Sequence, residues 1–173
     1  SEPDQQILRE INKELSVLTL KFGDHQLAEI NDFKLIIEKE EDLAGLPQFV
    51  KDMGKEDAKA AGLEGKWLFT LNKPSLIPFL QYSDRRDLRE KMFKGYTNIG
   101  NNNNENDNKA IVTRIASLRV KKAQLLGYES HAHFVLDNNM AKTPARVYEL
   151  MDKIWQAALP KAKMEKEELQ KMM

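Results

Sequence analysis

The chain has three histidines, His25, His131 and His133, and imidazole is the side chain best suited to hold a metal ion or to move a proton near neutral pH. On a helix, residues two apart project about 200° from each other, which is poor geometry for His131 and His133 to share one ion. Asp137 follows His133 by four residues on the same helical face, which leaves a weak metal-binding pair open. A packing role, or a role near a helix cap, is the favoured interpretation. His25 lies in the loop-like sequence GDHQ and is predicted to be solvated.

Other groups that could carry chemistry have simpler interpretations. The acidic run Glu38–Asp42 is typical of a solvated loop end, and no carboxylate is isolated among apolar residues, which is what raises a pKa for acid–base catalysis. Gly62–Gly65 lacks the Gly-Lys-Ser/Thr ending of a phosphate loop. The chain has no cysteine, which excludes thiolate catalysis, disulfides and cysteine-bound zinc. We therefore assign no catalytic, cofactor-binding or metal-binding residue to this sequence.

The composition is that of an ordinary globular domain. Lys and Arg together number 27, as do Asp and Glu, so no net charge attracts nucleic acid or an anionic membrane. No apolar run approaches the ~20 residues that span a bilayer. The lack of cysteine fits a reducing compartment, and we expect a cytoplasmic protein.

Apolar residues recur at helical spacing through most of the chain, which predicts a mainly α fold with one multi-helix lobe over residues 1–173. Each predicted helix has a start or stop signal. Three glycines, Gly23, Gly62 and Gly127, are predicted to end helices. Ser75 (with Pro78 in the first turn), Asp84, Ser130 and Thr143 are predicted to begin them, and Pro160 to kink or interrupt the last one. The predicted helices cover residues 4–22, a short stretch around 27–30, 47–61, 75–82, 85–99, 111–125, 131–140 and 144 onward.

Two short runs favour β-structure, at residues 33–39 and 66–71, and we expect them to pair as a small two-stranded element. The run 100–108 (GNNNNENDN) has no apolar side chain to bury and is predicted to be a flexible Asn-rich loop. The aromatic residues Trp67, Phe69, Phe93 and Trp155 lie on apolar faces, so core packing is predicted for all four.

Seven short segments occur in an informative order along the chain: Leu43–Pro47 (LAGLP), Gly65–Leu71 (GKWLFTL), Lys73–Ser75 (KPS), Leu88–Lys91 (LREK), Ser117–Arg119 (SLR), Leu125–Tyr128 (LLGY) and Met140–Pro144 (MAKTP). Together and in this order, they resemble the thimet oligopeptidase family of zinc metallopeptidases. The sequences of Gly65–Leu71 and Met140–Pro144 are most similar to the bacterial peptidyl-dipeptidase (Dcp) branch.

This resemblance implies a zinc-dependent parent enzyme that releases dipeptides from the C-termini of short peptides, within a mostly helical, two-lobed body around a deep channel. The family's zinc helix carries His-Glu-x-x-His, and no His-Glu pair occurs here. We therefore expect an inactive N-terminal-side fragment that binds no zinc. In the parent enzyme it would contact the remaining catalytic lobe and form part of the channel wall. Apolar residues near its end could cause self-association, namely Met164, Leu169, Met172 and Met173.

A second hypothesis stays open beside this one. The chain could be a stand-alone helical interaction module, without catalytic activity, that descends from the same family. Its balanced charge permits this interpretation, whereas the final helix, which runs to Met173 without a stop signal, argues against it.

Overall fold

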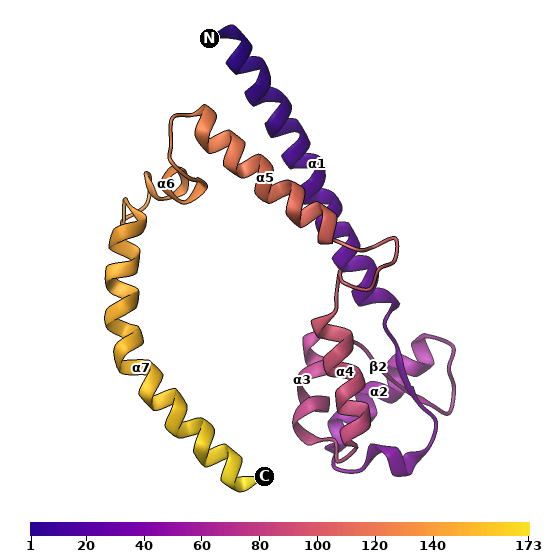
Figure 1. Cartoon of the computed structure of the whole chain (residues 1–173). Helices are drawn as coiled ribbons and strands as arrows, with labels where there is room; N and C mark the ends of the chain where they lie inside the picture. Colours follow the sequence, from indigo (N-terminus) through magenta and orange to yellow (C-terminus); the bar gives the residue numbers. More distant parts are fainter. The chain divides into compact units, whose positions relative to one another are not determined.

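The computed structural model describes all residues from 1 to 173. It is mainly α-helical with one small two-stranded antiparallel sheet, which confirms the predicted fold class (Figure 1). The elements are α1 Glu2–Asp32, β1 Leu35–Ile37, the 3₁₀ helix η1 Glu40–Leu43, α2 Gln48–Ala60, β2 Trp67–Phe69, α3 Lys73–Tyr82, α4 Arg86–Thr97, α5 Lys109–Leu125, α6 His131–Leu136 and α7 Pro144–Met172.

The contacts divide the chain into two compact units. Residues 15–115 form one unit, and residues 1–14 together with 116–173 form the other. The single lobe expected over residues 1–173 stays a prediction. None of the helices combines the length and the apolar character needed to cross a membrane.

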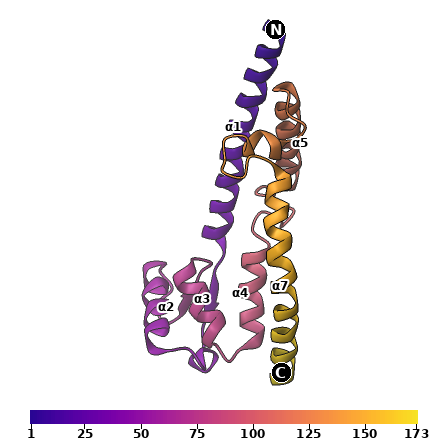
Figure 2. The same cartoon turned by 90° about the vertical axis from the view of Figure 1, so that its left-hand side faces the viewer.

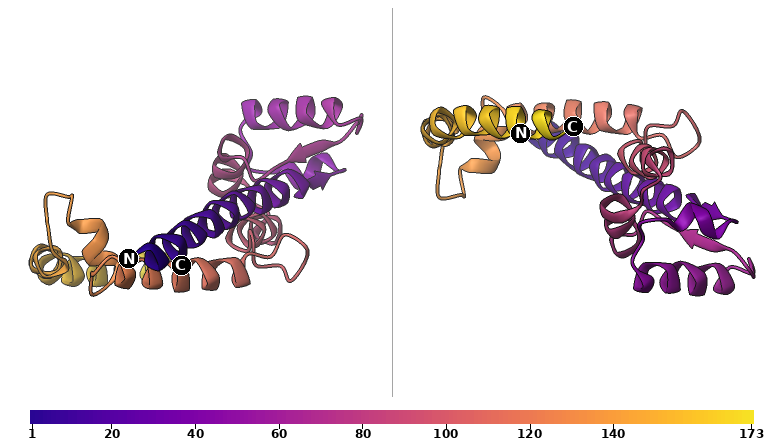
Figure 3. Two further views of the ribbon diagram at one scale, coloured as in Figure 1. Left: turned by 90° about the horizontal axis from the view of Figure 1, so that it is seen from above. Right: turned by 90° about the horizontal axis from the view of Figure 1, so that it is seen from below.

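The unit of residues 15–115 is built on the predicted strand pair. Leu35 of β1 lies opposite Phe69 of β2, and Ile37 lies opposite Trp67, in an antiparallel register (Figure 3). Leu35 and Ile37 are buried while Ile36 between them is 40% exposed, which is the alternation of a strand with one covered face. A two-stranded sheet is marginal by itself, so the helices packed on it are part of its stability.

Helices α2, α3 and α4 supply further residues of this core (Figure 2). The rings of Phe69 and Phe79 lie 4.7 Å apart at a tilt of 58°, and both residues are fully buried. Gly54 of α2 faces the Phe69 ring so closely that a Cβ there would lie 2.8 Å from Phe69 Cζ. This glycine therefore permits the close approach of α2 to β2. The core also contains Leu35, Ile37, Leu43, Leu46, Val50, Leu71, Leu76, Leu88 and Met92.

The prediction that Gly23 ends the first helix is wrong, because α1 continues to Asp32. His25 consequently lies within this helix and not in a solvated loop, and the predicted helix around 27–30 is its last part. A glycine within a helix costs only about 1 kcal/mol. Tertiary contacts on both sides of Gly23 offset this cost: Asn108 Nδ2 donates to the Phe22 carbonyl at 3.1 Å, and Glu29 is buried.

Two predicted caps in this unit are also wrong. Helix α3 begins at Lys73 with Pro74 in its first turn, so Ser75 and Pro78 are inside the helix. The Ser75 hydroxyl instead accepts a hydrogen bond from Thr70 N at 3.0 Å and ties the end of β2 to α3. Asp84 does not cap α4, which starts at Arg86 with no side-chain cap. The Asp84 amide instead donates to the Ala44 carbonyl at 2.9 Å, a partner that lies far away in the sequence.

The other unit contains the end of α5, the short α6 and the long α7. The predicted stop after α5 is confirmed: Gly127 has φ +84°, and Tyr128 N donates to the Ala123 carbonyl at 2.9 Å. The predicted caps are confirmed too, since Ser130 Oγ accepts from His133 N and Thr143 Oγ1 accepts from Arg146 N. Pro160 does not interrupt α7, which continues to Met172.

The aromatic residues show where sequence periodicity misleads. Phe69 is fully buried, as predicted, and Trp67 is half-buried. Phe93 and Trp155 are 57% and 62% exposed, so their predicted core packing is wrong within this chain. Periodicity identifies the apolar face of a helix, but only the tertiary structure decides whether another element covers that face.

Candidate functional site

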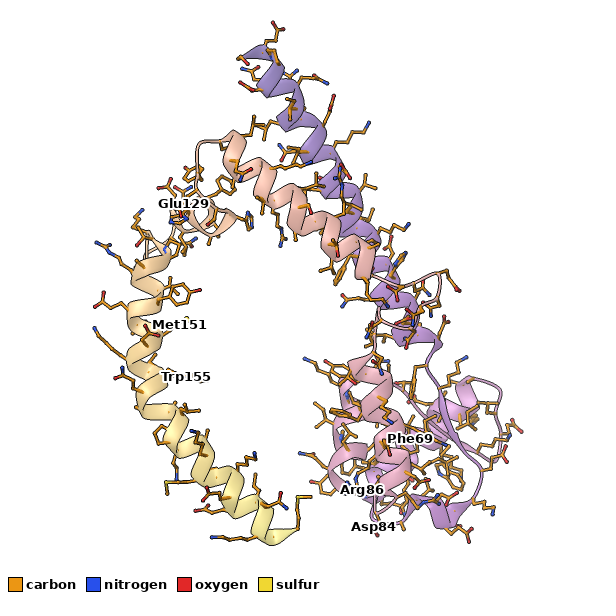
Figure 4. The ribbon with its side chains drawn as sticks, viewed as in Figure 1. Phe69, Asp84, Arg86, Glu129, Met151 and Trp155 are labelled. Atoms are coloured by element: carbon orange, nitrogen blue, oxygen red, sulfur yellow. The ribbon has the colours of Figure 1, made fainter.

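Two of the three histidines, His131 and His133, lie in α6. His133 Nδ1 is 2.9 Å from Ser130 Oγ, and its Nε2 is 3.6 Å from the carboxylate of Glu129 (Figure 4). Asp137 is engaged elsewhere, because its Oδ2 accepts a hydrogen bond of 2.9 Å from the Tyr128 hydroxyl. His133 and Asp137 therefore have separate partners, and the metal-binding pair left open by their spacing gains no support.

His131, on the same helix, lies beside an aromatic ring and two cationic side chains. Its ring centroid is 6.2 Å from that of Phe134, and Lys122 Nζ lies 5.6 Å from the Phe134 centroid. Burial, followed by the charges of Arg119 and Lys122, lowers the pKa of His131. All three causes favour the neutral imidazole. Its Nδ1 is buried without a hydrogen-bond partner, so this histidine packs as part of a small aromatic cluster.

The residues of this chain do not fit the zinc that the resemblance implies for the parent enzyme. His25, the third histidine, lies on α1, and its Nδ1 is buried without a hydrogen-bond partner. No group of three or more His, Asp or Glu side chains is placed to hold a metal ion. A zinc site needs three or four ligands at short distance. We derive no zinc-dependent step from these 173 residues.

The most connected polar site is one that the sequence reasoning missed. Glu29 of α1 is only 7% exposed, and its carboxylate accepts hydrogen bonds from the Asn-rich segment 100–108. Asn102 Nδ2 donates to both carboxylate oxygens at 2.9 Å, Asn104 Nδ2 donates at 2.8 Å, and the Gly100 amide also donates. Burial raises the pKa of Glu29, but these hydrogen bonds outweigh it and leave the pKa below its ordinary value.

A lysine organises the other amides of the same segment. Lys109 Nζ donates to Asn101 Oδ1 at 3.0 Å and to Asn103 Oδ1 at 2.9 Å, and it pairs with the Asp107 carboxylate. Hydrogen bonds from Lys109 lower the pKa of Asp107 to about 2. The even-numbered Asn102 and Asn104 therefore donate to an anion, and the odd-numbered Asn101 and Asn103 accept from a cation. The flexibility expected for residues 100–108 stays a prediction, although these contacts give the segment defined partners.

One signal in the sequence could have revealed Glu29. If α1 is continued through Gly23, Glu29 lies on the same helical face as Leu15, Phe22 and Phe33, where an apolar residue is expected. A carboxylate in an apolar stripe needs donors from elsewhere in the fold. The predicted helix end at Gly23 concealed this position.

A surface hollow of about 420 Å³ lies beside this network, with Asp32, Phe33, Lys94 and Asn98 in its wall. Hydrogen bonds from Gly100, Asn102 and Asn104 occupy the Glu29 carboxylate and lower its pKa. A carboxylate with a lowered pKa is a poor general base near neutral pH. The hollow contains no nucleophile paired with a base and no set of metal ligands. Its polar groups are better explained as the structural connection between α1 and the Asn-rich segment.

Comparisons with known proteins give the chain a family. The model of peptidase family M3 matches residues 79–173, which is more than half of the chain. Oligopeptidase A of Haemophilus influenzae is 34% identical over 173 residues, covering 98% of this chain and 25% of that protein. The Arabidopsis thaliana protein named "Probable cytosolic oligopeptidase A" is 32% identical, over 92% of this chain and 23% of its own length. Dipeptidyl carboxypeptidase of Escherichia coli is 31% identical, over 94% and 24%.

These figures support the family resemblance and do not single out the dipeptidyl carboxypeptidase branch, because oligopeptidase A matches at least as well. The chain spans about a quarter of the length of the curated relatives it matches. The residues that match the family model include α4, α5, α6 and α7. Of the seven segments that carry the resemblance, the last four lie within the matched residues and the first three precede them. The chain belongs to peptidase family M3.

Proposed function

We propose that this chain is a non-catalytic helical part of a larger zinc-dependent oligopeptidase that cleaves short peptides. The observation that carries the proposal is the match to oligopeptidase A over 98% of this chain but only 25% of the relative's length. The proposed role is to form part of the wall of the substrate channel. Such a wall admits short unfolded peptides and excludes folded proteins.

The composition of the chain supports a division of labour with the remainder of the enzyme. The 173 residues contain no His-Glu-x-x-His sequence and no group of side chains placed to hold zinc. In an enzyme of this kind, a bound zinc ion would supply Lewis-acid chemistry for peptide hydrolysis, and it would need three or four protein ligands. We assign the catalytic ligands to residues outside this chain.

The test compares the native gene product with the 173-residue chain in zinc content and peptide hydrolysis. The native coding region is sequenced and expressed, and both proteins are dialysed and incubated with short peptides, with and without a chelator. We expect stoichiometric zinc and chelator-sensitive cleavage for the native product and neither for the chain. A native product that equals this chain in mass, or that cleaves nothing with zinc bound, would contradict the proposal.

A narrower activity, release of C-terminal dipeptides, is a proposal within this one. It is supported by the amino-acid sequences of Gly65–Leu71 and Met140–Pro144 and by the match to dipeptidyl carboxypeptidase. Mass spectrometry of the products decides it, with peptides whose C-terminus is free or amidated. Stepwise loss of two residues from free C-termini supports dipeptide release, whereas cleavage at internal bonds of both substrates supports an oligopeptidase that cuts within the peptide.

The alternative of a stand-alone interaction module is favoured by one observation, the exposed apolar residues of α7. The intact mass of the native protein distinguishes the two functions, because a stand-alone module would have a mass near 20.0 kDa.

A cytoplasmic location is also part of the proposal, supported by the lack of cysteine. Fractionation of the source cells tests it, and recovery of the native protein within an organelle would contradict it.

A further inference from the structure

Helix α7 carries a long apolar stripe that nothing in its own unit buries. We propose that this stripe is a docking face for a helical segment of the same polypeptide that lies outside these 173 residues. The inference rests on the proposed function and adds the identity of one internal interface. We define the α7 stripe as Val147, Met151, Ile154, Ala158, Leu169 and Met172.

The stripe lies on one face of the helix. Its first four members are spaced by four, three and four residues, and Leu169 and Met172 return to the same direction after the intervening turns. Met151, Ile154 and Leu169 are 54%, 58% and 62% exposed, and no residue of α7 is buried. Trp155, 62% exposed, borders the stripe (Figure 4). Lys161 and Glu165 interrupt this face between Ala158 and Leu169, so its uninterrupted apolar part is Val147–Ala158. A soluble chain rarely leaves an apolar surface of this kind uncovered.

The opposite face of α7 has the character of a surface that stays in water. Glu149 and Lys153 form an i,i+4 ion pair of 3.0 Å there, and Gln156 is also exposed. Because only one side of the helix is apolar, the partner covers one side, as in the outer helix of a bundle. The stripe covers about 37 Å at 1.5 Å per residue, a length that suits a helix better than a short peptide.

The length of the relatives identifies the source of the partner. This chain matches about a quarter of their length, so about three quarters of the polypeptide in those proteins lies elsewhere. A covalently attached segment meets the stripe at a high effective concentration, whereas a second copy must find it by diffusion. The segment should be apolar opposite Val147–Ala158 and polar opposite Lys161 and Glu165, which form an i,i+4 pair of 3.9 Å on the same face.

Thiol labelling of two matched positions tests this inference independently of enzymatic activity. Ile154→Cys places a thiol in the stripe, and Gln156→Cys places one on the opposite face two residues away. Each substitution is made in the native gene product and in the 173-residue chain, which has no cysteine of its own. The rate of maleimide addition is read for the tryptic peptide containing each position by mass spectrometry, so other cysteines of the native product do not interfere.

We expect the thiol at position 154 to react roughly tenfold or more slowly in the native product than in the chain, because docking blocks the reagent. The thiol at position 156 should react at the same rate in both. Equal rates at position 154 would overturn the inference. Protection at position 154 in the chain alone, rising with its concentration, would also overturn it and identify a second copy as the partner. Since labelling requires no catalysis, a native product without peptidase activity could still pass or fail this test.

Discussion

At the scale of single residues, two charges orient the amides of the Asn-rich segment. Glu29 collects hydrogen-bond donors from Asn102 and Asn104, and Lys109 collects acceptors from Asn101 and Asn103. Asparagine offers both a donor and an acceptor, so the four residues look equivalent in the sequence. In the fold they fall into two classes that substitution by aspartate can separate.

Asn102→Asp should destabilise the protein, whereas Asn101→Asp should not. The first change replaces an amide donor with a carboxylate beside the buried Glu29, and we expect a loss of about 1–3 kcal/mol in the free energy of unfolding. The second places a carboxylate beside Lys109 at an exposed position and should change stability by less than about 0.5 kcal/mol. Urea unfolding at neutral pH measures both, and equal effects of the two substitutions would contradict the assignment of donors and acceptors.

The same network predicts a dependence of stability on pH. The pKa of folded Glu29 lies below the ordinary value of 4.5, so its contribution is fully present above that value and is lost as the pH falls through the folded pKa. Glu29→Gln removes the titrating group and should cost about 1–3 kcal/mol at pH 7. We expect the difference from the unmodified protein to shrink as the pH is lowered below about 4.5.

Urea midpoints of the two proteins, measured across the acidic range, give this comparison. Asp107, whose pKa is lowered to about 2, is present in both and adds a common loss at lower pH. A difference that stays constant with pH would show that Glu29 does not act through its charge.

At the scale of elements, glycines in two helices have opposite surroundings. A Cβ at Gly54 of α2 would press on the Phe69 ring, which is fully buried and cannot move away. A Cβ at Gly23 of α1 would meet nothing within 4 Å. The intrinsic preference for alanine in a helix is the same at both positions, so the difference between the two substitutions measures tertiary packing.

Gly54→Ala should therefore destabilise by about 1–3 kcal/mol, because overpacking outweighs the gain in helix propensity. Gly23→Ala should stabilise by up to about 1 kcal/mol, because the gain is unopposed. Thermal or urea unfolding of the two variants, side by side, provides the measurement. Stabilisation by both substitutions would mean that α2 does not approach β2 as closely as the structure shows.

At the scale of the whole molecule, burial is unevenly distributed. The core cluster lies entirely within the unit of residues 15–115, whereas α7 has no buried residue. An isolated helix gains little from propensity alone, and its amides open at low cost when no packing holds it.

We expect the amides of α7 in the 173-residue chain to exchange hydrogen far faster than those of α2 and α3. Hydrogen exchange with mass spectrometry, resolved by peptide, provides the comparison. Protection of α7 that equals that of α2 at low protein concentration would contradict the expectation. It would also weaken the inference that α7 needs a partner outside this chain.

The sequence by itself was sufficient for whatever depends on neighbouring residues. The two strands, the caps at Ser130 and Thr143, and the helix end before Gly127 follow from local hydrogen bonding and backbone preference, and the structure confirms them. The order of short segments was likewise sufficient for the family, because it is a property of the chain alone.

Only the tertiary structure decided the features whose cause lies far away in the sequence. Helix α1 continues past Gly23 because Asn108 and the partners of Glu29 hold it from 70 or more residues away. Phe93 and Trp155 are exposed because no element of their own unit covers them, which no periodicity can report. A helix face, a glycine or an asparagine has several compatible roles locally, and the free energy that selects one comes from groups brought to it by folding.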